Sequence, residues 1–326
     1  MSGRKVVLYY AWSRPGEIGA PLVVIEDRFP TLFESRRLDF PRFADLSEPS
    51  RFDQGIGGFL DLIMERNFTA FVELAQARTG RPVTEIERVT DDGKRTALDA
   101  DVLASADTLI VIGFDSFRTG QEASHDEIEA VRDFLTQPDH LVFICPHHDI
   151  GNATDLADDA RLERQVVDFL HHGDRSIPPR QQFGKFARSL LAGLGVPVEN
   201  RFGLRPAAEP DGSPSPIEIE AKIDRLHLLA GVDTFNLHPH LPQLERLGDA
   251  TSKLQVLARQ KIDLTAPPHP FTQDGRETFD ALLQSRTDAF AGTLLVSDTT
   301  LWSSTAGGVD SLRRLWSNVV QRPPRS

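Results

Sequence analysis

The sequence predicts an α/β fold built on a mainly parallel, doubly wound sheet, and three observations support this fold class. Short apolar runs with the character of buried strands recur along the chain, most clearly at residues 5–12, 107–114, 141–144 and 292–297. Segments with a helical spacing of apolar residues alternate with these runs. Polar residues follow the runs abruptly, which is typical of strands that end at the carboxyl edge of an open sheet.

Residues 106–151 give the strongest local prediction. A buried strand is followed by a polar loop, an amphipathic helix and a second buried strand. Two parallel strands joined by a helix form a βαβ unit, which is right-handed in nearly all proteins. We therefore expect several strands to end along one edge of one sheet, namely 107–114, 141–145, 232–237 and 293–297.

The remaining segments extend this pattern within a single domain, residues 1–326. Strands are also predicted within 82–89 and 253–264, and helices within 156–170, 182–194, 279–283 and 309–320. An inserted irregular and helical segment, residues 29–78, should cover the sheet edge or the active site. Within it, the apolar period from Phe52 to Arg78 predicts a helix. This helix should bury Phe59, Ile63, Phe68 and Phe71.

Composition and charge narrow the classes of protein to which the chain can belong. A formal net charge of -12 over 326 residues disfavours a nucleic-acid partner or an anionic membrane surface. The single cysteine excludes an internal disulfide and fits a reducing cytoplasm. No apolar stretch has the length of a signal peptide or membrane span, and no glycine-rich nucleotide-binding motif occurs. We expect a cytoplasmic protein that acts on a small molecule without a nucleotide cofactor.

Reactive side chains crowd the end of the predicted strand at 141–144. Cys145, His147, His148 and Asp149 lie within a few positions of one another. Ligands of open α/β sheets bind just beyond such strand ends. We therefore regard Cys145, His148 and Asp149 as candidate catalytic residues. The alternative is a capped strand end with ordinary surface histidines.

A second group of histidines, His238 and His240, flanks Pro239. In an extended chain, residues i and i+2 share a face, so these two histidines form one pair of possible ligands. His147 and Asp149 form another pair with the same spacing. Imidazole and carboxylate groups suit divalent zinc, iron or manganese. We predict a metal site formed by His147, His148, Asp149, His238 and His240, with His269 as a weaker contributor. Buried histidines bonded to backbone groups are the alternative.

The segment Val142-Phe-Ile-Cys-Pro-His-His-Asp149 resembles the strand-then-cysteine turn of class I glutamine amidotransferases and their relatives, including the ThuA-like proteins. The resemblance implies a glutamine-amidotransferase-like (flavodoxin-like) fold and places Cys145 at the nucleophile. It also matches His238-Pro239-His240 to the family's His-Pro-Glu segment. The chain departs from the family at Pro146, which has no N–H to stabilise an oxyanion, and at His240, which replaces the glutamate.

These observations lead us to expect a metal-dependent enzyme acting on a small polar substrate at the carboxyl edge of the sheet. Hydrolysis by a metal-activated water is the default reaction, and a redox metal performing oxygen chemistry would use overlapping ligand types. Two alternatives remain open. One is a cysteine-dependent acyl-transfer or lyase enzyme that uses Cys145 and a histidine, and the other is a non-catalytic ligand-binding or assembly domain.

Overall fold

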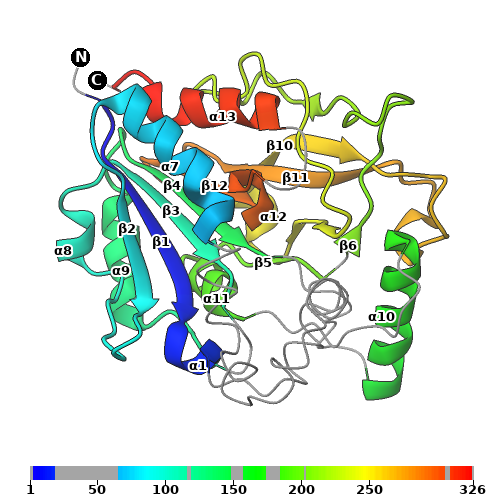
Figure 1. The fold of residues 1–326 in the computed structure, drawn as a ribbon, viewed down its shortest axis with the longest axis horizontal. Coiled ribbons are helices and arrows are strands. Elements are labelled where there is room, and N and C mark those ends of the chain that lie inside the picture. The colour runs from blue at the N-terminus through cyan, green and yellow to red at the C-terminus, as the bar shows by residue number, and fades with distance from the viewer. Residues whose placement is uncertain are drawn as a thin grey trace, which may run out of the picture.

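An eight-stranded sheet forms the centre of the molecule, with the strand order β2-β1-β3-β4-β12-β11-β10-β7 (Figure 1). The computed structural model that shows it describes residues 3–18, 65–115, 119–147, 157–173, 184–201, 203–304 and 309–324. Five strands pair in parallel: β2 (Thr84–Val89), β1 (Val6–Ser13), β3 (Thr108–Gly113), β4 (Leu141–Pro146) and β12 (Thr293–Ser297). Three more strands pair antiparallel beside β12: β11 (Thr278–Ser285), β10 (Leu254–Lys261) and β7 (Glu218–Ile219). The predicted α/β class and the mainly parallel sheet are confirmed.

Two predictions about the last third of the chain are wrong. Residues 279–283, predicted as a helix, lie within β11, because a short apolar run fits a buried strand as well as a helix. Residues 232–237, predicted as a strand, belong to none of the described strands. Val232 and Phe235 are nevertheless buried, so the apolar pattern there reports packing of an irregular segment rather than strand pairing.

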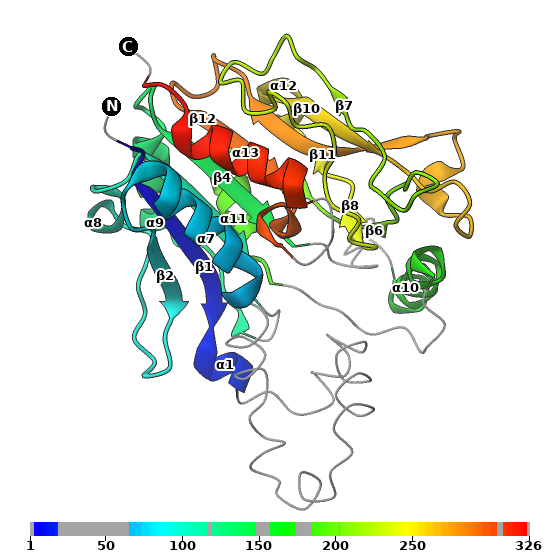
Figure 2. The same ribbon diagram turned by 45° about the horizontal axis from the view of Figure 1, so that its top comes forward.

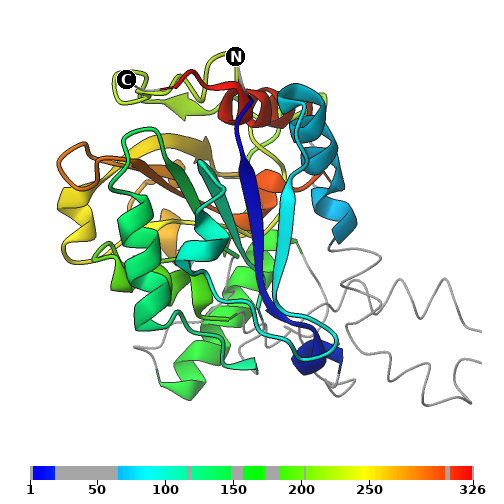
Figure 3. The ribbon, with the colours of Figure 1, turned by 90° about the vertical axis from the view of Figure 1, so that its left-hand side faces the viewer.

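Helices cover both faces of the sheet, because successive residues of its strands point in opposite directions. Leu8 and Tyr10 face the hydrophobic cluster beneath α7 (Glu65–Thr79) and α13 (Val309–Gln321). Tyr9 faces the cluster beneath α8 (Ala100–Leu103), α9 (His125–Phe134) and α11 (Phe186–Gly193). Figure 3 shows these two helical layers on either side of the sheet.

The described part of the predicted helix at 52–78 is α7, and it buries Phe68 and Phe71 as predicted. Phe71 packs edge-on against Trp302, with ring centroids 4.8 Å apart. Phe59 and Ile63 lie outside the described residues, as does most of the predicted insertion.

The helix α10 (Asp158–His172) stands beside the short strand β6 (Gly203–Leu204), away from the helices that cover the sheet (Figure 2). β6 pairs with β8 (Leu241–Pro242), and β5 (Val198–Glu199) pairs with β9 (Glu245–Arg246). The remaining elements are α1 (Arg14–Ile18), α12 (Ala250–Lys253), η3 (Pro270–Thr272) and η4 (Thr299–Trp302). Within the described ranges, no helix combines the length and the apolar character needed to cross a membrane.

Candidate functional site

Six histidines from four separate segments lie side by side, and we call them the histidine cluster. Ring centroids are 6.1 Å apart for His147 and His238, 5.6 Å for His238 and His240, and 3.8 Å for His240 and His172. The cluster continues from His172 to His171 at 6.1 Å and from His171 to His269 at 5.1 Å. The sequence contains ten histidines, so most of them converge on one place.

His147 occupies the carboxyl end of β4, where polar residues were predicted to gather. Its backbone N–H donates to the carbonyl of Gly113 at the end of β3 (3.2 Å), and its ring stacks on Phe114 with centroids 4.4 Å apart. Its carbonyl accepts a hydrogen bond from the side chain of Asn200. These contacts hold the buried imidazole in one orientation.

Asp298 faces this imidazole from the neighbouring strand. Val296 of β12 pairs with Ile144 of β4, so the chain leaves β12 beside His147. The distance from Nδ1 of His147 to Oδ2 of Asp298 is 3.6 Å, and Oδ1 of Asp298 accepts from the backbone N–H (2.8 Å) and hydroxyl (2.6 Å) of Thr300. Burial opposes the charge of Asp298, but His147 and the bonds from Thr300 lower the pKa of this carboxyl below its ordinary value. Asp298 is therefore ionised at neutral pH.

The predicted pair His238 and His240 lies next to His147. The backbone N–H of His240 donates to Nδ1 of His238 (3.3 Å), and the backbone N–H of His238 donates to Oδ1 of Asn236 (3.0 Å). Because Nδ1 of His238 accepts, its proton in the neutral ring resides on Nε2. His238 could therefore bind a metal through Nε2 only if it gave up the bond from His240.

The pair His238 and His240 is also where the histidine cluster meets solvent, because both side chains are partly exposed. Protein atoms nevertheless surround the imidazoles, and burial lowers the pKa of His238 to about 4. Burial and the neighbouring histidines hold the pKa of His240 well below its ordinary value. Both rings are neutral at physiological pH, the state in which imidazole binds metals.

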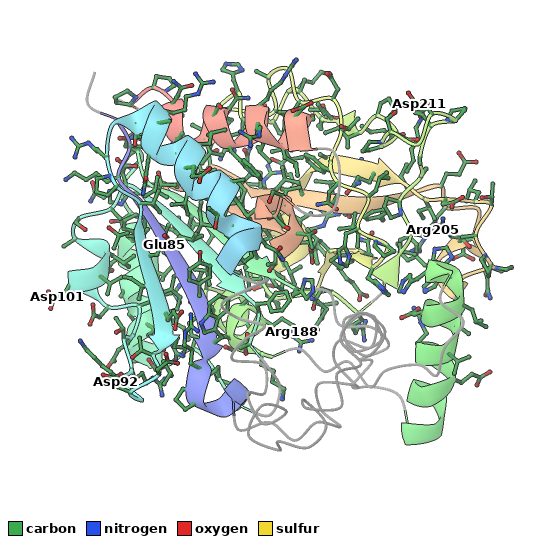
Figure 4. All side chains as sticks on the ribbon, in the orientation of Figure 1. Glu85, Asp92, Asp101, Arg188, Arg205 and Asp211 are labelled. Carbon is green, nitrogen blue, oxygen red and sulfur yellow. The ribbon has the colours of Figure 1, made fainter. Side chains whose placement is uncertain are left out.

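The last turn of α10 adds two histidines that the sequence analysis did not include. Asp168, His171 and His172 follow an i, i+3, i+4 spacing, so they share one face of the helix. Burial lowers the pKa of His172 to about 3 and also lowers the pKa of His171. Arg205, labelled in Figure 4, lies beside the end of this helix at Gly173.

The nitrogens of these two imidazoles are incompletely hydrogen-bonded within the described part of the chain. Nδ1 of His171 donates to the carbonyl of Pro267 (2.7 Å), whereas its Nε2 is buried without a partner. Neither nitrogen of His172 meets strict hydrogen-bond geometry with any described residue, although the backbone of Gly203 is close enough to act as a hydrogen-bond partner of the ring and to oppose the fall in its pKa. Buried polar atoms of folded proteins are nearly always paired, so Nε2 of His171 points to a missing partner.

His269 differs from its neighbours because both of its ring nitrogens are engaged. Nδ1 accepts from the backbone N–H of Phe271 (3.1 Å), and Nε2 donates to Asp168. Asp168 also accepts from Nε of Arg164 (3.1 Å). His269 therefore ties the loop before η3 to α10, and these bonds leave it no nitrogen for a metal.

Cys145 lies in the hydrophobic core and has 0% of its surface exposed. Its Sγ accepts from Nε1 of Trp302 (3.2 Å) and lies 3.4 Å from the hydroxyl of Ser297. Burial raises the pKa of the Cys145 thiol to about 12, so it is protonated at neutral pH. A catalytic thiol needs an accessible thiolate, and neither condition is met here. Nothing in this environment supports a nucleophilic role.

The structure thus brings together three of the five predicted metal ligands, His147, His238 and His240. His148 and Asp149 lie outside the described residues. Among the residues that are described, no three His, Cys, Asp or Glu side chains have the arrangement of a formed metal site.

The residues that the sequence analysis missed are Asp298, His171 and His172. Asp298 had a signal, because it directly follows a predicted strand.

A cavity of about 300 Å³ lies at the opposite edge of the sheet, near the start of β10. Its lining includes the cations Lys222, Arg225 and Arg286. Arg225 donates to the carbonyl of Ser285 (2.9 Å), and Arg286 lies 3.5 Å from Asp288. Both arginines therefore already have partners within the protein, as is common for charged groups at a surface.

No protein-family model matches the sequence, and no curated protein shows significant similarity to it.

Proposed function

We propose that this chain is a metal-dependent enzyme whose reaction centre is the histidine cluster. The observation that carries the proposal is the convergence of His147, His172, His238 and His240 from distant parts of the sequence at the carboxyl edge of the sheet. Binding sites of open α/β sheets lie at this edge. Several of the imidazoles are held neutral by burial, which is the protonation state in which imidazole binds a cation.

The donor atoms fit a transition metal better than a hard cation. Imidazole nitrogen is a ligand for zinc and iron, whereas magnesium and calcium require oxygen ligands. A divalent metal would supply Lewis acidity and lower the pKa of water at the site. Hydrolysis of a small polar substrate is the reaction class that we propose.

His147 and Asp298 would supply the base for this reaction. Asp298 is ionised and faces Nδ1 of His147, so it favours the tautomer that carries the proton on Nδ1. In that tautomer Nε2 carries the lone pair and would take a proton from an attacking water. A positioned base of this kind typically contributes about 10²–10⁴-fold to the rate.

The strand order supports a further proposal, that the fold is of the glutamine-amidotransferase-like (flavodoxin-like) type. Numbered along the chain, the five parallel strands are ordered 2-1-3-4-5 in space. This is the order of flavodoxin-like sheets. The buried Cys145 means that any such relationship would concern the fold and not thiol chemistry.

Metal-stripped protein, reconstituted separately with zinc, iron and manganese, tests the proposed function. We expect stoichiometric uptake of one of these metals and a higher melting temperature, because a ligand that binds the folded state stabilises it. We also expect metal-dependent turnover on a panel of small esters, amides and phosphate esters. If none of the metals is taken up or shifts the melting temperature, the proposed function is wrong.

A further inference from the structure

A line of hydrogen bonds joins the turn that carries His238 to the proposed base. The backbone N–H of His238 donates to Oδ1 of Asn236 (3.0 Å), and Nδ2 of Asn236 donates to the hydroxyl of Thr300 (3.1 Å). The Thr300 hydroxyl donates to Oδ1 of Asp298 (2.6 Å), whose Oδ2 lies 3.6 Å from Nδ1 of His147. Asn236, Thr300 and Asp298 are all buried, so these bonds form away from solvent.

We propose that Asn236 and Thr300 are positioning residues, which fix the Asp298 carboxylate toward His147 and hold the His238 turn against this pair. Both residues act through Asp298 rather than by contact with the substrate. The inference rests on the proposed function, because it concerns the base that was assigned to His147 and Asp298. It goes further by naming the residues that keep this base aligned with the rest of the histidine cluster.

The orientation of the Asn236 amide is fixed by groups that can bond in only one way. The carbonyl of Thr300 can only accept, and Nδ2 of Asn236 donates to it (3.0 Å). The backbone N–H of His238 can only donate, so the oxygen of the Asn236 amide must face it. The nitrogen of this amide therefore faces Thr300 and its oxygen faces His238.

The hydroxyl of Thr300 passes this direction on to Asp298. A hydroxyl has one hydrogen to donate. Because Nδ2 of Asn236 is itself a donor, the hydroxyl accepts from it, and the single hydrogen is directed to Oδ1 of Asp298. The backbone N–H of Thr300 donates to the same oxygen (2.8 Å). Oδ1 is thus held by two donors, and Oδ2 is left to face His147.

The carboxylate of Asp298 needs such support because rotation about its terminal side-chain bond is soft. The two bonds to Oδ1 set the plane of the carboxylate and so direct Oδ2 toward Nδ1 of His147. If the Thr300 hydroxyl were removed or turned away, the carboxylate would rotate more freely. The preference of His147 for a proton on Nδ1 would then weaken.

Asn236 is itself anchored to the central sheet. Nε2 of Gln260, a buried residue of β10, donates to the backbone carbonyl of Asn236 (3.1 Å). The line of hydrogen bonds therefore begins at a paired strand, although Asn236 lies in an irregular segment. Outer partners that orient metal ligands typically contribute about 10–100-fold to metal affinity or activity.

The experiment is nitrogen NMR of the histidine side chains in full-length, metal-free protein, with the His147 signals identified by their absence from His147→Gln. Thr300→Val removes the hydroxyl and keeps the shape of the side chain. We expect the ratio of the Nδ1-protonated to the Nε2-protonated His147 ring to fall about 2- to 10-fold, as the net loss of one hydrogen bond predicts. Thr300→Ser keeps the hydroxyl and should keep the wild-type ratio.

Asn236→Asp tests the direction of the bonds with almost no change of shape. A carboxylate oxygen replaces the Nδ2 donor, so it attracts the single hydroxyl hydrogen of Thr300 away from Asp298. The tautomer ratio of His147 should therefore fall as it does in Thr300→Val. Asn318→Asp is the matched control, because Nδ2 of Asn318 also donates to two oxygens, both of them backbone carbonyls at 2.9 Å. This control should keep the wild-type ratio.

Circular dichroism and melting curves show whether each variant folds, and Thr300→Val with Thr300→Ser decides the inference if Asn236→Asp does not. An unchanged ratio in folded Thr300→Val, or an equal fall in Asn318→Asp, would overturn the inference. Either result would leave the proposed function standing, because metal uptake is measured separately. A wild-type His147 protonated on Nε2 would overturn both the inference and the proposed base.

Discussion

Two buried polar clusters of this protein differ in how completely their hydrogen bonds are satisfied. In the first, which we call the Arg88 network, Arg88 donates to both carboxylate oxygens of Glu127 and to the hydroxyl of Tyr9 (3.0 Å). Its Nε donates to Gln121 (2.9 Å), and the Tyr9 hydroxyl donates to the carbonyl of Thr96 (2.8 Å). In the histidine cluster, by contrast, the buried Nε2 of His171 has no hydrogen-bond partner within the described residues.

The difference indicates what each cluster is for. A fully satisfied buried network stabilises one arrangement of the chain and has no capacity left for a ligand. An incompletely satisfied cluster costs free energy in the isolated protein, and that cost is removed when a ligand binds. The Arg88 network should therefore control stability, whereas the histidine cluster should control metal binding.

The largest effect on stability is expected from Glu127→Gln. This change leaves the buried charge of Arg88 without its partner, and breaking such a pair typically costs about 3–5 kcal/mol in the free energy of unfolding. Urea denaturation of the metal-free protein measures this loss in the free energy of unfolding. Glu129→Gln is the control, because Glu129 pairs with Arg132 at the surface of the same helix and such pairs contribute about 0–1 kcal/mol. Equal midpoints for the two variants would contradict the structural role of the Arg88 network.

Asp298→Asn should have a smaller effect on stability but a specific effect on His147. The amide keeps an acceptor for Thr300 and removes the negative charge, so we expect a loss of about 1–3 kcal/mol. Nitrogen NMR of the imidazole should show the proton on Nδ1 in the wild type and a shift toward Nε2 in the variant. Asp288→Asn, at an exposed aspartate, should leave the spectrum unchanged. A wild-type ring protonated on Nε2 would rule out the proposed base.

Acid should destabilise the two clusters in different pH windows. An unfolded histidine takes up a proton near pH 6.5, whereas burial lowers the pKa of His172 to about 3. The unfolded state therefore binds more protons between these values, and stability falls as the pH drops below about 6.5. For Glu127, burial opposes ionisation, but the bonds from Arg88 lower the pKa to about 2, so its contribution is lost only below pH 4.5. Glu127→Gln should remove the loss of stability below pH 4.5 and leave the loss below about pH 6.5 unchanged.

The smallest effect at neutral pH is expected from His172→Leu in metal-free protein. Removing an incompletely hydrogen-bonded buried imidazole should change the free energy of unfolding by less than about 1 kcal/mol, or stabilise the protein slightly. The same variant should reduce the rise in melting temperature that zinc gives the wild type. A loss of several kcal/mol without metal would show that His172 is already satisfied by its surroundings.

The sequence predicted the parallel part of the sheet because its strands are buried on both faces and carry uninterrupted apolar runs. The run at 107–114 became β3 and the run at 141–144 became β4, with adjacent ends. In the antiparallel part, β10 lies within the strand predicted at 253–264. The neighbouring strand β11 was mistaken for a helix, because its eight residues are too few for the apolar period to separate a strand from a helix.

The sequence predicted only part of the candidate site, because local patterns single out some of its residues and not others. His147, His238 and His240 stood out because they follow strands or flank prolines in dense groups. His171 and His172 did not, because a polar-rich helix with two histidines at its end is typical of an exposed surface element. Their role depends on where α10 packs, and its contact with β6 joins segments about 30 residues apart, which no local pattern reveals.

X-ray absorption at the zinc edge of the loaded wild-type protein tests the central claim most directly. The account predicts imidazole nitrogens about 2.0–2.1 Å from zinc and no sulfur ligand, because Cys145 is buried and protonated. The same measurement on His172→Leu should show a weaker imidazole signal. A sulfur neighbour at about 2.3 Å, or an unchanged imidazole signal in His172→Leu, would contradict metal binding by the histidine cluster.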